Sequence, residues 1–312
     1  MERKETGLFR AGFVAIVGRP NVGKSTLLNR LLGEHVAIVS ARPQTTRTRI
    51  LGILHGKGVQ MALFDTPGVH QAKGPLNRRM VETALGTLAE VDLALVLVEA
   101  GTGPNLKVEP GDTVRLVVEK VRRAGKPAVL GINKMDRAPR ETLLPVIEAY
   151  RGLFDWQAVV PFSALTGENV DRLVECLGAL LPEAEAPLFP EDMLTDQAER
   201  VLAAEYVREQ AMELTRDEIP YSLAVEVEEF DESSRRDRGG LVHIGAVVLV
   251  ERESQKAIVI GKGGSMLKKI GTRARERLER LLGAKVFLRL TVKVEERWRE
   301  KAAALKRLGI GP

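Results

Sequence analysis

The sequence predicts an α/β protein in which a doubly wound parallel sheet is followed by a smaller α+β domain. From residue 13 to residue 181, short apolar runs alternate with segments of helical periodicity, as strands and helices do in a parallel sheet. Residues 181–192 then concentrate proline and acidic side chains, which is typical of a linker. Beyond them the predicted order changes to helix, strand, strand, helix and strand. We therefore expect a first domain at residues 1–182, a linker at 183–195 and a second domain at 196–312.

The composition indicates a globular protein with an acidic partner. Of the 312 residues, 44% are hydrophobic and 29% are charged, which argues against a disordered chain. The net charge of +5 and a pI near 9.3 favour a polyanion such as a nucleic acid. The single cysteine, Cys176, lies in an apolar helical pattern and predicts neither a disulfide nor a metal framework. Residues 1–12 are charged rather than signal-like, and no apolar run has membrane-spanning length, so we expect a cytoplasmic protein. We also expect a monomer.

In the first domain, each predicted strand is a short apolar run and each predicted helix has apolar residues at helical spacing. Strands are predicted at residues 13–17, 50–55, 59–64, 93–98, 128–132 and 158–161. Helices are predicted at residues 27–32, 114–124, 143–151 and 169–181. Gly56, Lys57 and Gly58 form a tight turn that makes the second and third strands a hairpin. In such a sheet, ligands bind at the carboxyl ends of the strands.

In the second domain, a long helix is predicted at residues 196–215. The alternation at residues 223–230 is typical of a strand with one solvated face, and residues 231–240 are predicted to be a charged loop. Two further strands are expected at 241–251 and 257–260, separated by a turn around residues 253–254. The remaining elements are a helix at 261–282, a strand at 285–294 and a helix at 298–308.

The first strand runs into Gly18-Arg19-Pro20-Asn21-Val22-Gly23-Lys24-Ser25, and a helix follows. Strand, glycine-rich loop and helix in this order are the context of a Walker A phosphate loop. The glycines let successive backbone N–H groups point at phosphate oxygens, and the helix N-terminus adds positive potential. Lys24 is then placed to reach the β- and γ-phosphates, and Ser25 to bind Mg²⁺. We expect nucleotide contacts from Gly18, Asn21, Val22, Gly23, Lys24, Ser25 and Thr26.

The third strand ends in Asp65-Thr66-Pro67-Gly68. Asp-Thr-Pro-Gly is also a good turn sequence, but its place at a strand end after a phosphate loop favours a γ-phosphate sensor. Asp65 would act on Mg²⁺ through water, and the backbone N–H of Gly68 would approach the γ-phosphate.

Asn133-Lys134-Met135-Asp136 follows the fifth strand and predicts the base. A carboxylate at Asp136 accepts from both the ring N–H and the exocyclic amine of guanine, whereas adenine offers no such pair of donors. Lys134 would lie along the ring, and Asn133 would brace the loops. Ser163-Ala164-Leu165, after the sixth strand, would offer a backbone N–H to the guanine oxygen. Together these motifs predict a P-loop GTPase domain that binds GTP and GDP with Mg²⁺.

The basic loop at residues 40–49 contains two threonines, Thr45 and Thr46, that are candidates for a further Mg²⁺ ligand. A switch threonine completes the Mg²⁺ shell and brings its carbonyl to the γ-phosphate. The residues themselves do not decide between the two, and a plain basic loop is the alternative. The Thr-Thr-Arg arrangement resembles that of translational GTPases, and this resemblance favours Thr46.

Two residues bear on how GTP would be hydrolysed. Val69 stands where many signalling GTPases have the glutamine that orients the attacking water, so that device is missing. Asn21 resembles the asparagine that lets related GTPases hold K⁺ near the transferring phosphate, where the cation supplies the charge of an arginine finger. The alternative is that Asn21 only shapes the loop. We expect the catalytic set to be Lys24, Thr46, Asp65, Gly68 and Asn21, with Ser25, Thr46 and Asp65 as the metal ligands.

The second domain carries Gly261-Lys262-Gly263-Gly264, followed by a basic helix. This arrangement is that of a KH domain, in which the loop clamps a single-stranded backbone beside an apolar groove for the bases, and the element order suits the type II form. Residues 261–289 hold nine Lys or Arg against two Glu, so positive charge is focused there, although a solvated basic helix is the alternative. Aromatic residues are only 4% of the chain, which argues against stacking of bases on a sheet. We expect RNA contacts from Ile260, Gly261, Lys262, Gly263, Gly264, Lys268, Lys269 and Arg273.

The motifs together resemble the Era family of GTPases, which join a GTP-binding domain to a C-terminal type II KH domain. The resemblance covers nearly the whole chain. It includes Pro43-Gln44-Thr45-Thr46-Arg47, residues 65–70, residues 189–196 and Ile219-Pro220-Tyr221. It implies a role in small-subunit ribosome assembly, with the single-stranded 3′ end of 16S ribosomal RNA and the 30S subunit as partners. Composition and spacing by themselves indicate only a site for single-stranded nucleic acid.

The sequence thus favours a GTP-hydrolysing switch that gates RNA binding. A second hypothesis is a KH module in which GTP is structural and hardly turned over. A third hypothesis is a GTPase that modifies RNA, but the second half of the chain lacks a candidate catalytic acid, base or metal cluster. The basic C-terminal helix also allows weak peripheral contact with a membrane surface.

Overall fold

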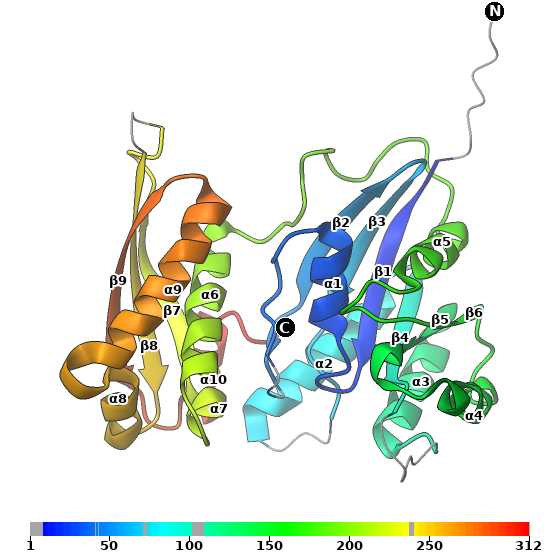
Figure 1. The fold of residues 1–312 in the computed structure, drawn as a ribbon, viewed down its shortest axis with the longest axis horizontal. Coiled ribbons are helices and arrows are strands. Elements are labelled where there is room, and N and C mark those ends of the chain that lie inside the picture. The colour runs from blue at the N-terminus through cyan, green and yellow to red at the C-terminus, as the bar shows by residue number, and fades with distance from the viewer. Residues whose placement is uncertain are drawn as a thin grey trace, which may run out of the picture.

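In a computed structural model, the chain forms two α/β parts that lie side by side (Figure 1). The structure describes residues 9–40, 42, 44–70, 74–101, 109–236 and 240–311. Pro43, residues 1–8 of the charged N-terminal segment and residues 237–239 of the expected charged loop lie outside the described residues. Among the helices that are described, none combines the length and the apolar character needed to span a membrane.

The first part contains a six-stranded sheet with the order β2-β3-β1-β4-β5-β6. Its strands are β1 (Arg10–Gly18), β2 (Ile50–Gly56), β3 (Val59–Asp65), β4 (Leu93–Glu99), β5 (Ala128–Asn133) and β6 (Ala158–Pro161). Strand β2 pairs antiparallel with β3 through the expected hairpin, and the other pairs are parallel. The six strands predicted from the apolar runs are thus confirmed.

Helices cover both faces of this sheet, as doubly wound topology requires. They are α1 (Lys24–Leu32), α2 (Gly74–Glu90), α3 (Asp112–Ala124), the 3₁₀ turn η1 (Met135–Arg137), α4 (Arg140–Arg151) and α5 (Val170–Leu180). Helices α1 and α5 cover one face of the sheet. The core between them and the sheet includes Leu27, Leu28, Leu173 and Leu177. The other core lies under α2, α3 and α4, and includes Ala84, Leu88, Val117 and Val146. Each helix therefore buries one stripe against the sheet.

Helix α2 is absent from the sequence-based expectations. Its buried side chains recur every fourth residue, but they serve two different cores. Ala84 and Leu88 pack under the sheet, whereas Leu76 and Met80 pack against the C-terminal segment of the chain. Leu76, Met80, Ala84 and Leu88 nevertheless lie along one side of the helix, because residues four apart share a helix face. The sequence therefore has a helical pattern here that the expectations above do not include.

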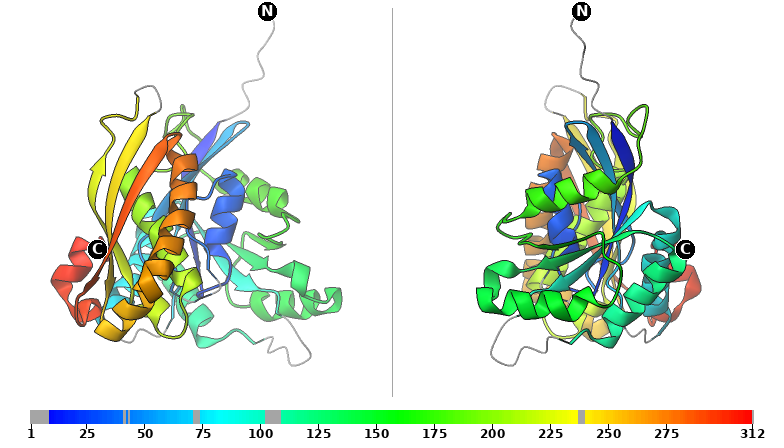
Figure 2. Two further views of the ribbon diagram at one scale, coloured as in Figure 1. Left: turned by 60° about the vertical axis from the view of Figure 1, so that its left-hand side comes forward. Right: turned by 90° about the vertical axis from the view of Figure 1, so that its right-hand side faces the viewer.

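The second part contains the three-stranded sheet β7-β8-β9, in which β7 is antiparallel and β9 parallel to the central strand. Its elements are α6 (Glu199–Leu214), α7 (Ile219–Ser222), β7 (Ala224–Asp231), β8 (Leu241–Val250), α8 (Glu253–Ile260), the 3₁₀ turn η2 (Lys262–Gly264), α9 (Ser265–Leu282), β9 (Lys285–Val294), the 3₁₀ turn η3 (Trp298–Glu300) and α10 (Ala302–Arg307). Helices α6 and α9 lie together on one face of this sheet, as Figure 1 and the left-hand view of Figure 2 show.

Two expectations for the second part are wrong. Residues 257–260 belong to helix α8 and not to a strand, and the expected turn at residues 253–254 is the start of that helix. Strands β8 and β9 are parallel neighbours, so the chain between them must cross over one face of the sheet, and helices α8 and α9 make this crossover. Residues 298–308 form η3 and α10 rather than one continuous helix.

The segment between the two parts is held on the first sheet. The backbone N–H of Ile53 donates to the carbonyl of Leu194 at 2.8 Å, so the segment pairs with strand β2. The Gln60 amide donates to the carbonyl of Phe189 at 2.8 Å. In Figure 1 this green trace runs from α5 over the ends of β2 and β3 to α6. The expected linker is therefore a packed strap rather than a free tether.

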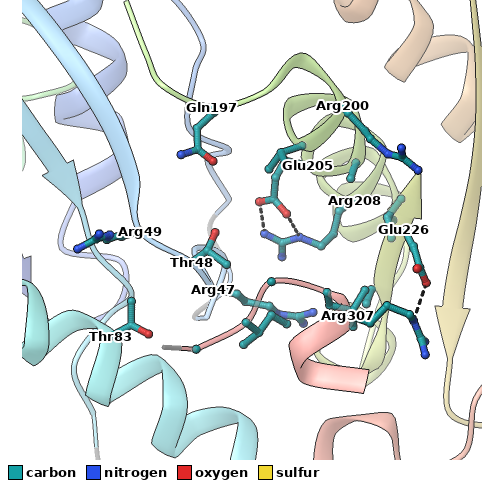
Figure 3. Close-up of a pocket in the computed structure, with 18 of the residues that line it drawn as sticks. Arg47, Thr48, Arg49, Thr83, Gln197, Arg200, Glu205, Arg208, Glu226 and Arg307 are labelled. Atoms are coloured by element: carbon teal, nitrogen blue, oxygen red, sulfur yellow. Dashed lines mark hydrogen bonds and ion pairs between the residues drawn. The ribbon is translucent and has the colours of Figure 1, made fainter. Parts of the chain in front are cut away.

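The two parts are also in contact through the C-terminal segment. Trp298 is fully buried and donates its indole N–H to the carbonyl of Ser222 at 2.7 Å. Arg79 of α2 donates to the carbonyl of Ile310 at 3.1 Å, beside the apolar contacts of Leu76 and Met80. Beside these contacts lies a cavity of about 840 Å³ with walls from α2, α6, β7 and the C-terminal residues (Figure 3).

Candidate functional site

The phosphate loop follows β1 through a tight backbone turn. Asn21 and Gly23 have positive φ angles of 61° and 102°. A Cβ atom at position 23 would lie 2.2 Å from the side-chain nitrogen of Asn133, so only glycine fits there. A pocket of about 70 Å³ lies at the loop. Of the predicted nucleotide residues, its walls include Asn21, Gly23, Lys24, Ser25, Thr26, Thr46 and Gly68.

Lys24 is 6% exposed and sits at the start of α1. Its ammonium group donates to the carbonyls of Arg19 at 3.0 Å and Gly18 at 3.5 Å. Burial lowers the pKa of Lys24 to about 8, although the carboxylate of Asp65 opposes this shift. A bound phosphate would supply the missing negative charge and stabilise the charged form of the amine.

Three oxygen-bearing side chains from separate segments converge beside the loop. The Ser25 hydroxyl donates to Asp65 Oδ2 at 2.6 Å. Thr46 Oγ1 lies 3.0 Å from Ser25 Oγ and donates to Asp65 Oδ2 at 3.4 Å. The hydroxyl of Thr45 instead donates to the carbonyl of Arg42 at 2.7 Å. The geometry thus separates two threonines that the sequence leaves equivalent.

The chemistry of this cluster fits Mg²⁺. Asp65 is fully buried, and its Oδ1 has no hydrogen-bond partner within the described part of the chain. Burial raises the pKa of the Asp65 carboxyl, with Lys24 opposing this effect. A divalent cation would satisfy the orphan oxygen and favour the ionised form. Carboxylate and hydroxyl oxygens are the ligands that Mg²⁺ prefers.

Gly68 lies directly against the phosphate loop. A Cβ atom at this position would approach Pro20 to 2.7 Å, so a side chain would push the two loops apart. The next residue, Val69, is fully buried and donates its backbone N–H to the carbonyl of Gly18 at 3.0 Å. Its side chain therefore packs in the core and has no polar group with which to orient water. The side chains of Gln44 and His70 lie close to each other, with 3.4 Å between Gln44 Nε2 and His70 Nε2.

The predicted guanine residues meet at the ends of β5 and β6. Asn133, 2% exposed, donates to the carbonyl of Val22 at 2.8 Å and accepts from the N–H of Ala164 at 2.9 Å. It therefore ties the phosphate loop to the loop after β6. The Asp136 carboxylate accepts from the hydroxyl of Ser163 at 2.6 Å, which fixes its orientation.

Lys134 has a positive φ of 66° and donates to the carbonyl of Asn21 at 2.7 Å. Its ammonium group also forms an ion pair with Glu99 at the end of β4, at 2.5 Å. Glu99 is absent from the predicted set, although its position at the carboxyl end of a strand could have indicated it. Leu165 is 58% exposed, as a side chain that flanks a base would be.

Arg30 is a second residue that the sequence analysis missed. This side chain of α1 donates to the carbonyls of Ala164, at 3.2 Å, and of Leu165. It holds the loop after β6 against the helix that starts at the phosphate loop. An arginine on a helix surface has no distinctive sequence context, so no pattern could have singled it out.

The predicted RNA residues lie at the junction of α8 and α9. Gly261, Gly263 and Gly264 have positive φ angles of 73°, 58° and 79°, so the loop depends on glycine. Lys262, Lys268 and Lys269 are exposed there. Ile260 is partly buried against the core of the second part, and Arg273 forms an ion pair with Glu213 at 4.0 Å. The structure therefore forms two separate clusters from the predicted residues, one on each part.

Comparisons with known proteins agree with this division. Residues 13–134 match the family described as 50S ribosome-binding GTPase, and residues 218–299 match the KH domain. The chain is 50% identical over 301 residues to GTPase Era of Geobacter metallireducens, covering 96% of this chain and 98% of the relative. It is 51% identical over 301 residues to GTPase Era of Geotalea uraniireducens, with the same coverage of both chains.

Two solved structures are similar over 97% of this chain and 100% of their own, each at 41% identity. One is Era in complex with MgGDPNP and nucleotides 1506–1542 of 16S ribosomal RNA, with a TM-score of 0.90. The other is a tyrosine-to-alanine variant of Aquifex aeolicus Era bound to GDP and AlF4⁻, with a TM-score of 0.88. With its P-loop GTPase domain and its KH domain, the chain belongs to the GTPase Era family.

Proposed function

We propose that this chain is a GTP-hydrolysing switch that binds the single-stranded 3′ end of 16S ribosomal RNA and assists assembly of the 30S subunit. The observation that carries the proposal is the likeness over 97% of the chain to an Era structure that holds both MgGDPNP and 16S ribosomal RNA. Two candidate sites support it, the side-chain cluster at the phosphate loop and the glycine loop at residues 261–264. A KH module without turnover is less well supported, because Lys24, Thr46 and Asp65 converge at the phosphate loop.

In this proposal, Ser25, Thr46 and Asp65 hold Mg²⁺, which neutralises charge on the β- and γ-phosphate oxygens when bound. Lys24 and the backbone N–H groups of residues 18–26 bind the phosphates. The backbone of Gly68 contacts the γ-phosphate, since only a residue without a side chain fits against Pro20.

Guanine is recognised by the Asp136 carboxylate, which the Ser163 hydroxyl orients. Asn133 sets the spacing between the phosphate and base sites, and Ala164 and Leu165 lie next to the ring. Because Val69 has no polar group, we propose that Asn21 helps to hold K⁺, which would supply positive charge at the transferring phosphate when bound.

RNA is bound by the loop at residues 261–264 and by the exposed lysines of α9. The proposed domains that carry the two sites are residues 1–182 and residues 196–312, with a linker at residues 183–195. We propose that the chain acts in the cytoplasm, where ribosomal subunits are assembled. Any membrane contact would be weak and limited to exposed cations such as Lys301 and Lys306, because Ala304 and Leu305 of α10 are buried.

The test is the double variant Lys262→Asp/Gly263→Asp, with RNA and GTP affinities measured on the same preparation. The RNA probe is a single-stranded oligonucleotide that matches the 3′ end of 16S ribosomal RNA. Like charge against phosphate should weaken RNA binding at least about tenfold and reduce the salt slope by roughly one per lost contact. GTP affinity should not change, because the loop lies in the second part of the chain.

The control is Lys301→Asp/Lys306→Asp, which makes a similar charge change on exposed positions of the same part. This control should bind RNA within about twofold of the parent chain. Parental RNA affinity in the loop variant, or an equal loss in the control, would show that the loop at 261–264 is not the RNA site.

A further inference from the structure

The loop that carries Thr46 lies along the second part of the chain. We call residues 34–49, between α1 and β2, the switch segment; its residues 41 and 43 are outside the described residues. Contacts to α6, α7 and the residues beside them occur along its length. They are Tyr206 Oη to the carbonyl of His35 (2.5 Å), the N–H of Val39 to Glu209 (3.0 Å), Arg42 to the carbonyl of Thr215 (2.5 Å), Arg208 to the carbonyl of Thr45 (2.5 Å) and Arg47 to the carbonyl of Leu223 (2.7 Å).

Thr46 therefore lies between two anchored neighbours. On one side, Arg208 Nη2 of α6 donates to the carbonyl of Thr45. On the other side, Arg47 is 5% exposed, and its guanidinium lies 5.4 Å from the ring centre of Trp298. The Arg47 guanidinium is charged, as arginine side chains are in proteins, and its Nη1 donates to the carbonyl of Leu223. With both neighbours fixed, the Thr46 hydroxyl has little freedom to leave Ser25 and Asp65.

Arg208 is itself oriented by its surroundings. It is 2% exposed, and its Nε and Nη2 donate to the two carboxylate oxygens of Glu205 at 2.8 and 2.5 Å. Nη1 lies 3.3 Å from the sulfur of Met212. Figure 3 shows the Arg208–Glu205 pair on α6 facing the switch segment. The guanidinium is planar and is held by Glu205 on one side and Met212 on the other, so its direction toward the Thr45 carbonyl is fixed. A lysine ammonium could not make these contacts at the same time.

This arrangement links the second part of the chain to the nucleotide site. A ligand that needs Thr46 beside Ser25 and Asp65 binds best when the switch segment rests on α6. GTP with Mg²⁺ requires this position of Thr46, whereas GDP has no γ-phosphate to contact. By linkage, the contact to α6 must favour GTP over GDP.

We propose that Arg208 is a positioning residue for GTP hydrolysis: from the KH side of the molecule, it holds the Thr45 carbonyl so that Thr46 faces the Mg²⁺ and γ-phosphate site. The proposal rests on the function proposed above, in which Thr46 is a metal ligand. Arg208 touches neither nucleotide nor metal and acts only through the switch segment.

The experiment measures single-turnover hydrolysis, Mg²⁺ dependence, and GTP and GDP dissociation constants for Arg208→Met and Arg208→Lys. Loss of one charge-assisted hydrogen bond should lower the hydrolysis rate and the preference for GTP over GDP by about tenfold each. The apparent Mg²⁺ affinity of the GTP complex should fall, while GDP affinity stays within about twofold. Arg208→Lys keeps the charge opposite Glu205 and should show the same defects with the fold intact.

The matched control is Arg200→Met, on the same helix, whose guanidinium donates to the carbonyls of Val227 and Glu228. It should hydrolyse GTP at the parental rate. A double-mutant cycle with Thr46→Ala then tests the route, because Arg208→Met should add little once the Thr46 hydroxyl is gone. Additive losses would overturn the proposal, since they mean a general structural role. So would parental rates in both Arg208 variants. If the Thr46→Ala variant hydrolyses GTP at the parental rate, then Thr46 is not a metal ligand, and it is the function proposed above that is refuted.

Discussion

The two hydrogen bonds of Asn133 allow a quantitative prediction. In Asn133→Ala, the carbonyl of Val22 and the N–H of Ala164 lose their partner at 2.8 and 2.9 Å in a region where Asn133 is 2% exposed. Leaving a buried polar group unpaired costs about 1–3 kcal/mol. For two groups with partial relaxation, we expect the free energy of unfolding to fall by about 2–4 kcal/mol.

The loss of this bridge should also change nucleotide binding, because it fixes the distance between the phosphate loop and the loop after β6. GTP and GDP use both loops equally, so both affinities should fall by the same factor, between about tenfold and a hundredfold. Urea denaturation gives the stability change, and titration of a fluorescent GDP and its competition by GTP give the two affinities.

The matched control is Asn29→Ala. Asn29 also makes two hydrogen bonds to the backbone: its amide donates to the carbonyl of Ala37 at 2.6 Å and accepts from the N–H of Ala37 at 2.8 Å. These bonds join α1 to the switch segment and not to the guanine loop. It should lose stability but keep its GDP affinity. If Asn133→Ala is destabilised as predicted and still binds GDP like the parent chain, the bridge has no role in nucleotide binding and the reasoning is refuted.

Two further predictions concern the charge around the phosphate. Because burial lowers the pKa of Lys24 to about 8, GTP affinity should fall as pH rises through 8, and binding at pH 8.5 should take up about three-quarters of a proton. Calorimetry in two buffers of different ionisation enthalpy measures this uptake, and none at pH 8.5 would contradict a neutral Lys24. Turnover in K⁺ should exceed turnover in Na⁺ and should lose this preference in Asn21→Ala. Equal rates in both salts would leave Asn21 as a loop former only.

The first sheet could be predicted from the sequence because its signals are local and repeated. Each buried strand is a continuous apolar run, and β1, β3, β5 and β6 are each followed at the carboxyl end by a polar motif, as Gly68 and Asn133 illustrate. The fold then has only one way to bring those motifs together, which is along one edge of the sheet. Glu99 lies at such a strand end, which could have indicated it, whereas Arg30 lies on a helix and its contacts become visible only in three dimensions.

The failures of prediction have two physical causes. Residues 257–260 are four apolar residues, a length at which strands and helices have the same pattern, and only the parallel pairing of β8 with β9 decides for a helix. Helix α2 has apolar residues at helical spacing, and the fold alone shows that they divide between the sheet and the C-terminal segment. In both cases the deciding partner lies far away in the sequence.

The contact between the switch segment and α6 is the extreme case of this limit. Arg208 and Glu209 follow the pattern of an ordinary charged helix, yet they are 2% and 1% exposed because they meet backbone groups of the switch segment. Helix α6 has almost no apolar stripe, since one of its faces packs on the second sheet and another on the switch segment. A charged residue within a helix that is buried on several sides must have a polar partner. The sequence could have indicated that Arg208 and Glu209 need polar partners, but only the fold identifies the partner as the segment that carries Thr46.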